Sequence, residues 1–548
     1  MKRTFYMILV AAATLFGAAA CSSSSKMAEQ AENVIVKCNP EVLEVVAGKV
    51  NATVTVTYPK GYFNSKAILK VTPVIVYQGG EAAGDVIVYQ GEKVKDNYKV
   101  VSSDGATVTE KISIPYVKGM EKSYLELRGV ASIKSKSVNL PSKKVADGAN
   151  TTYMLVKKEG RVSLKADNYQ DFISQTTEGQ ILYAINNADV RGSQLKGDSI
   201  KNFQAALEEI KSNQRKSLVS TEVVAYASPD GGESLNEKLS DKRARSAEAA
   251  WKKVAKNVNA EEHEVKSVGQ DWEGFQELVA KSDIQDKDLI LRVLSMYSDP
   301  AVRESEIKNM SEIYTDLKGE VLPELRRARF IANVEFQNYT ASELKKLVDD
   351  NIDELDEEAL LRAATLVKGA DKKIDIYNTA VKKFDSDRAR FNIGVVYLEE
   401  GDLAKAEKAF AKVTAQDGDL KNAQGVIALR KGDIAAAEAA FKAAGTPDSK
   451  ANLGVVDILN GNYAQAAAEL ADAPGFEHNK VLAYILNGQI AQAEAAATSR
   501  EASVSYLRAI IAARQNKNAT AKEWLKRASV NDELRQRQLT DIEFAGLE

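Results

Sequence analysis

The spacing of apolar residues changes twice along this chain, which indicates three differently built regions. Over residues 33–160, short runs alternate apolar and polar positions, as in "VTVTV" and "EKISI", and Gly, Pro, Asn or Asp separates the runs. Such alternation is typical of half-buried antiparallel strands. We therefore predict an all-β sandwich of Ig-like type, for which a spacer or protein-docking role is more common than a lectin or adhesin role.

The region 165–338 mixes strand and helix periodicities. The run "GQILYAIN" predicts a strand, and the helix predicted over "SIKNFQAALEEIKSNQ" has one apolar stripe, formed by Phe203, Ala206, Leu207 and Ile210. A strand "STEVVAYAS", a second helix, a third strand and the strand "RRARFIANVEF" follow. This order predicts a compact α/β domain with a mostly helical insertion before its last strand.

From residue 342 to 548 the chain is Ala-rich and repeats itself. Segments such as "NIGVVYLEEGDLAKAEKAF" and "ANLGVVDILNGNYAQAAAEL" align on turn residues with spacings of 31, 29, 27 and 28, at Gly401, Gly432, Gly461, Gly488 and Asn516. Each unit predicts a helix, a turn and a second helix. The pattern resembles tetratricopeptide repeats, whose usual period is about 34 residues. The resemblance implies an α-helical solenoid that recruits an unidentified protein partner.

Length and charge narrow the possible classes of protein. A chain of 548 residues is too long for a single hydrophobic core, so several domains are expected. Lys and Arg number 74 against 77 Asp and Glu, which gives a formal net charge of −3. Because there is no basic excess, we do not expect nucleic acid as a partner.

The N-terminus predicts an export signal. Lys2 and Arg3 precede the apolar run "FYMILVAAATLFGAA", which is too short for a stable membrane span but suits a signal peptide. The following "GAAAC" resembles the lipobox of bacterial lipoproteins, although Ala18 stands where that family prefers Leu. The resemblance implies removal of residues 1–20 and acylation of Cys21. The alternative is an ordinary secretory signal.

Residues 21–32 predict a flexible polar tether behind the lipid anchor. Lipoproteins of Bacteroidota that reach the cell exterior usually carry an acidic cluster soon after the lipidated cysteine, and "SSSSK" contains none. By this resemblance we expect a protein anchored in the outer membrane on its periplasmic side.

The stretch "SLNEKLSDKRARSAEAAW", residues 234–251, contains the most specific motif of the chain. Ser234, with Glu237 three residues later, predicts a capping box at the start of a helix. At about 100° per residue, Arg243 and the neighbouring Arg245 point to different sides of that helix. The two arginines should therefore have different roles.

This motif resembles the C-terminal domain of OmpA-type proteins, which bind peptidoglycan and have the pattern N-x-x-L-S-x-x-R-A after a strand and loop. The matching residues are Asn236, Leu239, Ser240, Arg243 and Ala244. The resemblance implies a ligand site for the free end of diaminopimelate in the peptidoglycan stem peptide. In that family the Arg binds the carboxylate of this zwitterion, and a loop Asp binds its ammonium.

The loop before the helix departs from the family pattern. Ser228 occupies the place of the ammonium-binding Asp, and Asp230 follows two residues later. One hypothesis is that Asp230 contacts the ammonium with help from the Ser228 hydroxyl. The alternative is that both residues only cap the loop, as Asp and Ser often do, and that Arg243 is a structural arginine.

No residues in the sequence suggest catalysis, a metal site or a cofactor. The two histidines, His263 and His478, have no ligand-type neighbours at metal-binding spacing, and no nucleophile or phosphate-binding motif occurs. We therefore expect a non-enzymatic envelope protein that binds peptidoglycan and recruits protein partners. The alternative is a structural subunit of an outer-membrane secretion or assembly complex whose OmpA-like domain no longer binds peptidoglycan.

Overall fold

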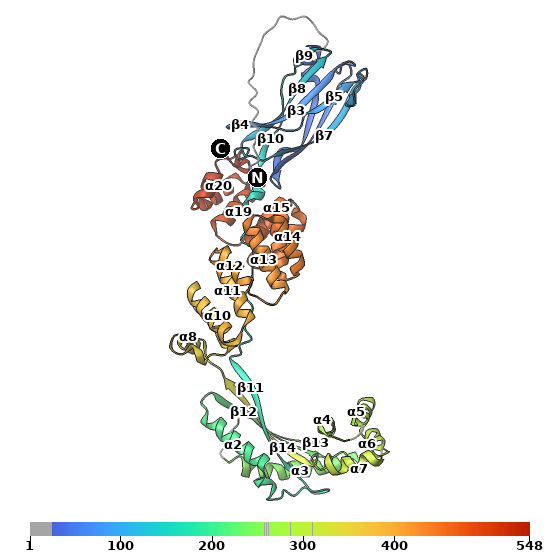
Figure 1. Cartoon of the computed structure of the whole chain (residues 1–548), viewed down its shortest axis with the longest axis vertical. Coiled ribbons are helices and arrows are strands. Elements are labelled where there is room, and N and C mark those ends of the chain that lie inside the picture. The colour runs from blue at the N-terminus through green and yellow to red at the C-terminus, as the bar shows by residue number, and fades with distance from the viewer. Residues whose placement is uncertain are drawn as a thin grey trace. The chain divides into compact units, whose positions relative to one another are not determined.

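The computed structural model describes residues 25–547, except residues 257, 259, 261, 285, 286 and 310 (Figure 1). The predicted signal peptide and the predicted lipidation site, Cys21, lie outside the described residues. The chain forms two compact units: one comprises residues up to Lys165 together with those from Asp387 onward, and the other is Ala166–Ser386. The second unit is therefore inserted into the sequence of the first.

The N-terminal region is rich in β-structure, as the alternating pattern predicts. In β2 the even positions from Val50 to Tyr58 are buried and the intervening ones are more exposed. After the short helix α1 (Ser25–Glu29), the strands are β1 (Ile35–Val46), β2 (Lys49–Tyr58), β3 (Ile68–Tyr77), β4 (Gly80–Ala83), β5 (Ile87–Gly91), β6 (Lys99–Val101), β7 (Ala106–Pro115), β8 (Ser123–Ile133), β9 (Lys136–Asn139) and β10 (Lys143–Asn150).

These strands form one continuous hydrogen-bonded sheet in the order β6-β5-β3-β8-β10-β1-β2-β7, with β4 and β9 at the side. Side chains connect the two ends of this path. The Tyr89 hydroxyl on β5 donates to Glu110 on β7 at 3.1 Å, and Lys99 on β6 pairs with the same carboxylate at 2.8 Å. The sheet therefore folds back on itself around a common apolar core.

The inserted unit contains the predicted α/β domain. Its strands are β11 (Phe172–Leu182), β12 (Lys216–Ala227), β13 (Glu262–Gln270) and β14 (Arg327–Gln337). The sheet order is β11-β14-β12-β13, and only β12 and β13 run parallel. Helices α2 (Asp198–Ser212) and α3 (Glu233–Val254) share an apolar core with the sheet, and Phe203, Leu207 and Ile210 of the predicted stripe are buried in it.

The helical insertion before β14 has a small apolar core of its own, centred on Phe275, Ile290 and Leu317. Its helices are α4 (Trp272–Lys281), α5 (Lys287–Met296), α6 (Pro300–Asn309) and α7 (Ser311–Glu320). Three further helices complete this unit: α8 (Ala341–Asp350), α9 (Glu357–Leu366) and α10 (Ala370–Phe384).

The C-terminal part of the first unit is an array of helix pairs, as the internal repeats predict. The pairs are α11 (Asp387–Glu399) with α12 (Leu403–Phe410), α13 (Gly418–Lys431) with α14 (Ile434–Ala444), α15 (Pro447–Asn460) with α16 (Tyr463–Leu470), α17 (Glu477–Leu486) with α18 (Ile490–Ala496), and α19 (Ala502–Arg514) with α20 (Asn518–Ala528). The short α21 (Asp532–Arg537) and the 3-10 turn η5 (Ile542–Phe544) follow.

All five aligned turn residues have the left-handed backbone that favours Gly or Asn, with φ of 77° at Gly401, 84° at Gly432, 84° at Gly461, 74° at Gly488 and 59° at Asn516. The two helices of a pair also pack closely. A Cβ atom on Gly425 would lie 2.5 Å from the ring of Phe441, so only glycine fits there. These two features explain why the repeats were visible in the sequence.

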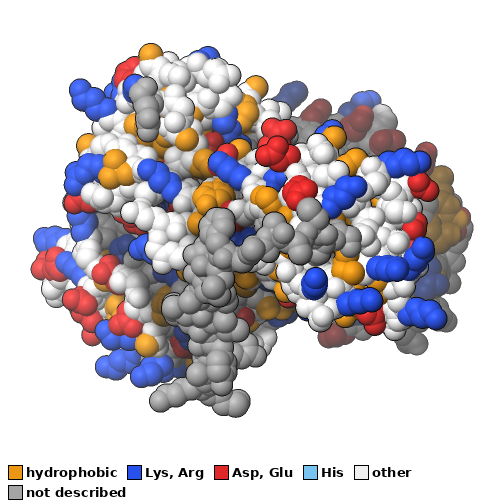
Figure 2. All heavy atoms as spheres, turned by 90° about the horizontal axis from the view of Figure 1, so that it is seen from above, with side chains coloured by type: hydrophobic (Ala, Val, Ile, Leu, Met, Phe, Trp, Pro, Cys, Tyr) orange, Lys and Arg blue, Asp and Glu red, His pale blue; other side chains and the backbone are white. Residues whose placement is uncertain are grey.

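Charge is mixed on the surface. On the face that Figure 2 shows, basic and acidic side chains are interspersed, and apolar side chains lie between them in small groups. Within the described residues, no helix is both long and apolar enough to cross a bilayer.

Candidate functional site

Helix α3, which contains the predicted motif, begins two residues earlier than the predicted capping box implies. Its N-cap is Gly232, no side chain caps its free N–H groups, and Ser234 is exposed within the first turn. The predicted Ser234 capping box is therefore wrong. Gly232 takes the N-cap position in its place, which moves Ser234 inside the helix.

Asn236 and Ser240 are buried, and both hold neighbouring segments in place. The Asn236 amide donates to the carbonyls of Ser228 at 3.1 Å and Gly231 at 2.7 Å. Ser240 donates to the Glu237 carbonyl at 2.8 Å and accepts from the Gly269 N–H at 3.1 Å. Asn236 thus fixes the loop after β12, while Ser240 joins α3 to β13.

Arg243 is the largest fully buried side chain in the described part of the molecule, with 1% of its surface exposed. Its guanidinium donates to three main-chain carbonyls and lies 4.9 Å from the centre of the Tyr183 ring; the carbonyls are those of Asn187 at 3.0 Å, Tyr226 at 2.9 Å and Ala184 at 3.2 Å. Burial lowers the pKa of Arg243 to about 10. The side chain is therefore still cationic at neutral pH.

Asp230 has partners within the protein. Its carboxylate accepts a short hydrogen bond from the Ser228 hydroxyl, and it forms an ion pair with Arg326 at 3.1 Å. The side chains of Asp230 and Arg326 are 15% and 12% exposed. Because a cation already neutralises this carboxylate, Asp230 differs from the free acidic group that an ammonium ligand requires.

Arg326, just before β14, was not among the residues predicted from the sequence. Its Nε is buried and has no hydrogen-bond partner among the described residues. The positive charge of Arg326 lies close enough to lower the pKa of Arg243, after the larger effect of burial, whereas Asp230 acts in the opposite direction. Buried Arg243 and half-buried Arg326 therefore lie near the same carboxylate, which pairs with Arg326, and no described carboxylate forms an ion pair with Arg243.

The predicted site residues thus divide into two groups. Ser228, Asp230 and Asn236 meet in the loop after β12. Arg243 binds the end of β12 just before this loop, through its bond to the Tyr226 carbonyl. Ser240 faces β13, and Leu239 is half-buried beside it. Arg245 is exposed, whereas Arg243 is buried. The arrangement places two arginines, Arg243 and Arg326, near the carboxylate of Asp230.

A second site lies on the helical array, where an extended segment of the chain is bound. Residues 156–165, which we call the strap, follow the β-rich region and have no regular secondary structure. They lie along the strap face, which we define as the face formed by α11, α13, α15 and α17. One buried asparagine on each of these helices binds the main chain of the strap: Asn392, Asn422, Asn452 and Asn479.

Three of the asparagines bind one strap residue each through both its N–H and its carbonyl. Asn479 binds Lys157 at 2.9 and 2.8 Å, Asn452 binds Arg161 at 2.9 Å for both bonds, and Asn392 binds Lys165 at 2.7 and 3.0 Å. Asn422 donates to the Arg161 carbonyl as well, at 2.9 Å. The strap therefore runs opposite to the order of the helix pairs: its N-terminal residue Lys157 binds α17, and its C-terminal residue Lys165 binds α11.

The basic side chains of the same strap residues contact acidic groups of the array. Lys165 lies between Asp417, at 2.6 Å, and Asp419. Arg161 pairs with Asp448 at 3.4 Å and also donates to the Pro474 carbonyl at 2.7 Å. Although burial acts to lower the pKa of Lys165, its hydrogen bonds to the two aspartates raise it above the ordinary value.

Apolar packing completes the fit of the strap. Val156 belongs to the core of the helical array, and Val162 and Leu164 pack against it. Gly160 has φ of 64°, and a Cβ atom there would lie 2.9 Å from Val426. The strap is therefore an integrated part of the first unit.

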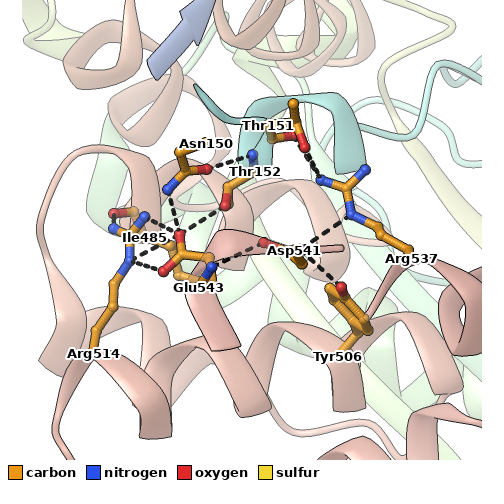
Figure 3. Close-up of polar contacts among 9 residues, drawn as sticks. All are labelled: Asn150, Thr151, Thr152, Ile485, Tyr506, Arg514, Arg537, Asp541 and Glu543. Carbon is orange, nitrogen blue, oxygen red and sulfur yellow. Dashed lines mark hydrogen bonds and ion pairs between the residues drawn. The ribbon is translucent and has the colours of Figure 1, made fainter. Parts of the chain in front are cut away.

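Figure 3 shows how the C-terminus joins the β-rich region to the helical array. Glu543 pairs with Arg514 of α19 and accepts hydrogen bonds from Asn150 at 2.8 Å and Thr152 at 2.7 Å. Nearby, Arg537 donates to Thr151, and Asp541 accepts from the Tyr506 hydroxyl at 2.8 Å. These contacts fix the end of β10 and the start of the strap to the last helix pair.

No protein-family model and no curated protein matches this chain. Solved structures that resemble it include a tetratricopeptide repeat protein from Parabacteroides merdae, at 14% identity over 43% of this chain and 98% of that one, with a TM-score of 0.29. Pseudomonas aeruginosa PilF covers 37% of this chain and 99% of its own at 14% identity, with a TM-score of 0.29. YrrB, described as a tetratricopeptide protein with an unusual peptide-binding site, covers 38% and 100% at 15% identity, with a TM-score of 0.22.

The class of the C-terminal part is defined by its own geometry. Consecutive helix pairs with left-handed turns, close interhelical glycines and a peptide-binding first-helix face form an array of tetratricopeptide type. Tetratricopeptide-type arrays form extended concave binding surfaces. The array of this chain binds a segment of the same chain, the strap.

Proposed function

We propose that this protein is a lipid-anchored component of the outer membrane, on its periplasmic side, whose α/β domain is OmpA-like and binds peptidoglycan. The observation that supports the proposal is the excess positive charge around buried Arg243, where half-buried Arg326 is also present and the carboxylate of Asp230 pairs with Arg326. The resemblance of the α3 motif to OmpA-type domains supplies the ligand. On this proposal the Ig-like β-rich region is a spacer between the anchor and the helical array.

The carboxylate of the stem-peptide diaminopimelate is the group that this site suits best. A guanidinium has five N–H donors, and Arg243 uses three of its N–H groups on main-chain carbonyls. A ligand carboxylate would add the missing countercharge through charge-assisted hydrogen bonds. Since Arg243 is 1% exposed, the surrounding loops must move before a ligand reaches it.

On this proposal the ammonium of diaminopimelate contributes less to binding than its carboxylate does. It would have to compete with Arg326 for Asp230, because the two side chains are paired at 3.1 Å. Recognition therefore depends mainly on the carboxylate, and the Ser228 hydroxyl serves to hold Asp230 in position.

Sedimentation of the full chain with purified peptidoglycan sacculi tests the proposal. Wild type should sediment, and a stem peptide that contains diaminopimelate should compete, while the same peptide with lysine at that position, which lacks the free carboxylate, should not. Arg243→Lys keeps the positive charge but loses the planar set of N–H donors that can bind a carboxylate through two parallel hydrogen bonds. It should weaken binding to sacculi at least about tenfold. Exposed Arg245→Lys is the matched control. Thermal unfolding of each variant shows whether a loss of binding is a loss of fold.

A wild-type chain that stays in the supernatant would overturn wall binding, and so would equal effects of the two arginine substitutions. One observation favours the alternative function in that case: the bonds of Arg243 to three carbonyls complete the fold without a ligand. The protein would then be a non-enzymatic structural subunit of an outer-membrane secretion or assembly complex. A stoichiometric membrane complex that survives lysozyme digestion of the wall would support this alternative.

A further inference from the structure

The strap face has the composition of a binding site for a basic, extended peptide. Its asparagines contact main-chain groups of the strap, so they select an extended backbone rather than particular side chains. Side-chain selectivity comes from charge. Lys157, Arg161 and Lys165 stand four residues apart, and each pairs with an acidic residue of the array, namely Glu501, Asp448, and Asp417 with Asp419.

We propose that the strap is the permanent ligand of this peptide-binding face and that it excludes other peptides from it. The tetratricopeptide-type array is then a module whose ligand is supplied by its own chain. Protein partners of the array would bind to its other surfaces. This inference is independent of peptidoglycan binding, since it concerns the other unit of the chain.

Tethering explains why a free peptide cannot compete. At one end the strap continues from the turn η2 (Thr152–Leu155), where Thr151 and Thr152 are bonded to the C-terminal helices. At the other end Lys165 is bound on α11, the helix at which the chain re-enters this unit. Tethered ligands of this kind have effective concentrations of about 1 mM or more. A free peptide with an intrinsic Kd of about 1 μM would therefore bind about a thousandfold more weakly.

Burial gives a second reason for permanent occupancy. The four asparagines are at most 4% exposed, so an empty strap face would remove the main-chain partners of four buried amides. Asn452 and Asn422 would keep only the bond between their own side chains, at 2.8 Å. Unsatisfied buried amides are costly, and removal of the strap would also uncover Val156 and the residues that pack around Val162 and Leu164. The strap face is therefore more stable when the strap occupies it than when it is empty.

A charge-reversed strap provides the test. In the full chain, Lys157→Glu, Arg161→Glu and Lys165→Glu together place acidic groups against the acidic residues of the array, which should release the strap and leave the asparagines intact. A labelled synthetic peptide of sequence LVKKEGRVSLK, residues 155–165, should then bind this variant at least about a hundredfold more tightly than it binds wild type. The same peptide with Glu at the three basic positions is the matched control and should not bind.

Two results would overturn the proposal: wild type that binds the peptide as tightly as the variant, or a folded variant that binds neither peptide. Amide hydrogen exchange of unaltered protein gives a second measurement that does not depend on the variant's folding. The N–H groups of Lys157, Arg161 and Lys165 should exchange at least about a hundredfold more slowly than the exposed main chain of Lys158, and excess peptide should not change their rates. Exchange of these three amides at the rate of Lys158 would contradict permanent occupancy.

Discussion

Asn452 of α15 satisfies both main-chain polar groups of Arg161, accepting its N–H and donating to its carbonyl at 2.9 Å each. The two residues are 291 positions apart, and the asparagine is fully buried. The Asn452 side chain thus binds the strap to the third helix pair of the array.

Replacement of this asparagine should destabilise the first unit. Asn452→Ala leaves the Arg161 N–H without its acceptor, and we expect the free energy of unfolding to fall by about 1–3 kcal/mol. Urea denaturation of the full chain measures the change, followed by the fluorescence of Trp524 in α20 in a background where Trp251 and Trp272 of the other unit are replaced by Phe. Asn518→Ala, at an exposed position of the same array, should stay within about 0.5 kcal/mol of wild type. Equal effects of the two substitutions would contradict the role assigned to Asn452.

His478 should make the same unit sensitive to acid. Its Nε2 bonds to the Leu155 carbonyl at 2.7 Å, at the start of the strap, and its buried Nδ1 has no partner among the described residues. Burial lowers the pKa of His478 to about 4, whereas an unfolded histidine titrates near about 6.5. Between these values the unfolded state binds the proton and the native state does not. Stability is therefore full above about pH 6.5 and falls as the pH decreases toward about 4.

The total loss from this one group should be about 3 kcal/mol at pH 4. Urea unfolding at several pH values between about 7 and 4 measures it. His478→Gln retains an amide donor for the Leu155 carbonyl but does not titrate, so its stability should depend less on pH across this window. If wild type and variant lose stability in parallel, His478 is not the group responsible.

The buried ion pair at the C-terminus should be far more important to stability than an exposed pair of the same kind. Glu543 is 6% exposed, pairs with Arg514 and accepts from Asn150 and Thr152. Glu543→Gln removes the countercharge of a largely buried arginine, and we expect a loss of about 3–5 kcal/mol. The control is Glu523→Gln. Glu523 is 64% exposed and its partner Arg527 is 48% exposed, so this substitution should change the free energy of unfolding by less than about 1 kcal/mol. Thermal or urea unfolding distinguishes the two.

The sequence predicted those features of the array that depend on local chemistry. The left-handed turns require Gly or Asn, so the repeats could be aligned on Gly401, Gly432, Gly461, Gly488 and Asn516. The role of the buried asparagines was not predicted, although two of the aligned repeats contain "NIGVV" and "NLGVV", which begin with Asn392 and Asn452. Their ligand was not visible, because the strap has neither helical nor strand periodicity and its partners lie more than 200 residues away along the chain.

The candidate site shows the same limit. Helical spacing predicted different sides of α3 for Arg243 and Arg245, and in the structure Arg243 is buried and Arg245 is exposed. The counterion of Asp230 could not be predicted, because Arg326 is 96 residues away and only the register of β14 against β12 brings it near the loop. The capping box failed for a local reason, since Gly232 could serve as N-cap and the sequence pattern did not distinguish it from Ser234.

Substitution of Asp230 separates the two interpretations of the loop. If its carboxylate binds a ligand ammonium, Asp230→Asn should weaken peptidoglycan binding. The ion pair with Arg326 predicts the opposite result: loss of the carboxylate releases Arg326 and leaves both arginines without an acidic partner, so a ligand carboxylate should bind more tightly, by about three- to tenfold. Sedimentation with sacculi at increasing salt measures this, because the added charge attraction should weaken as salt screens it.

Glu233→Gln, an exposed acidic position at the start of the same helix, is the matched control and should leave binding unchanged. Weaker binding by Asp230→Asn alone would show that the ammonium contact dominates, and unchanged binding would show that the loop has only a structural role.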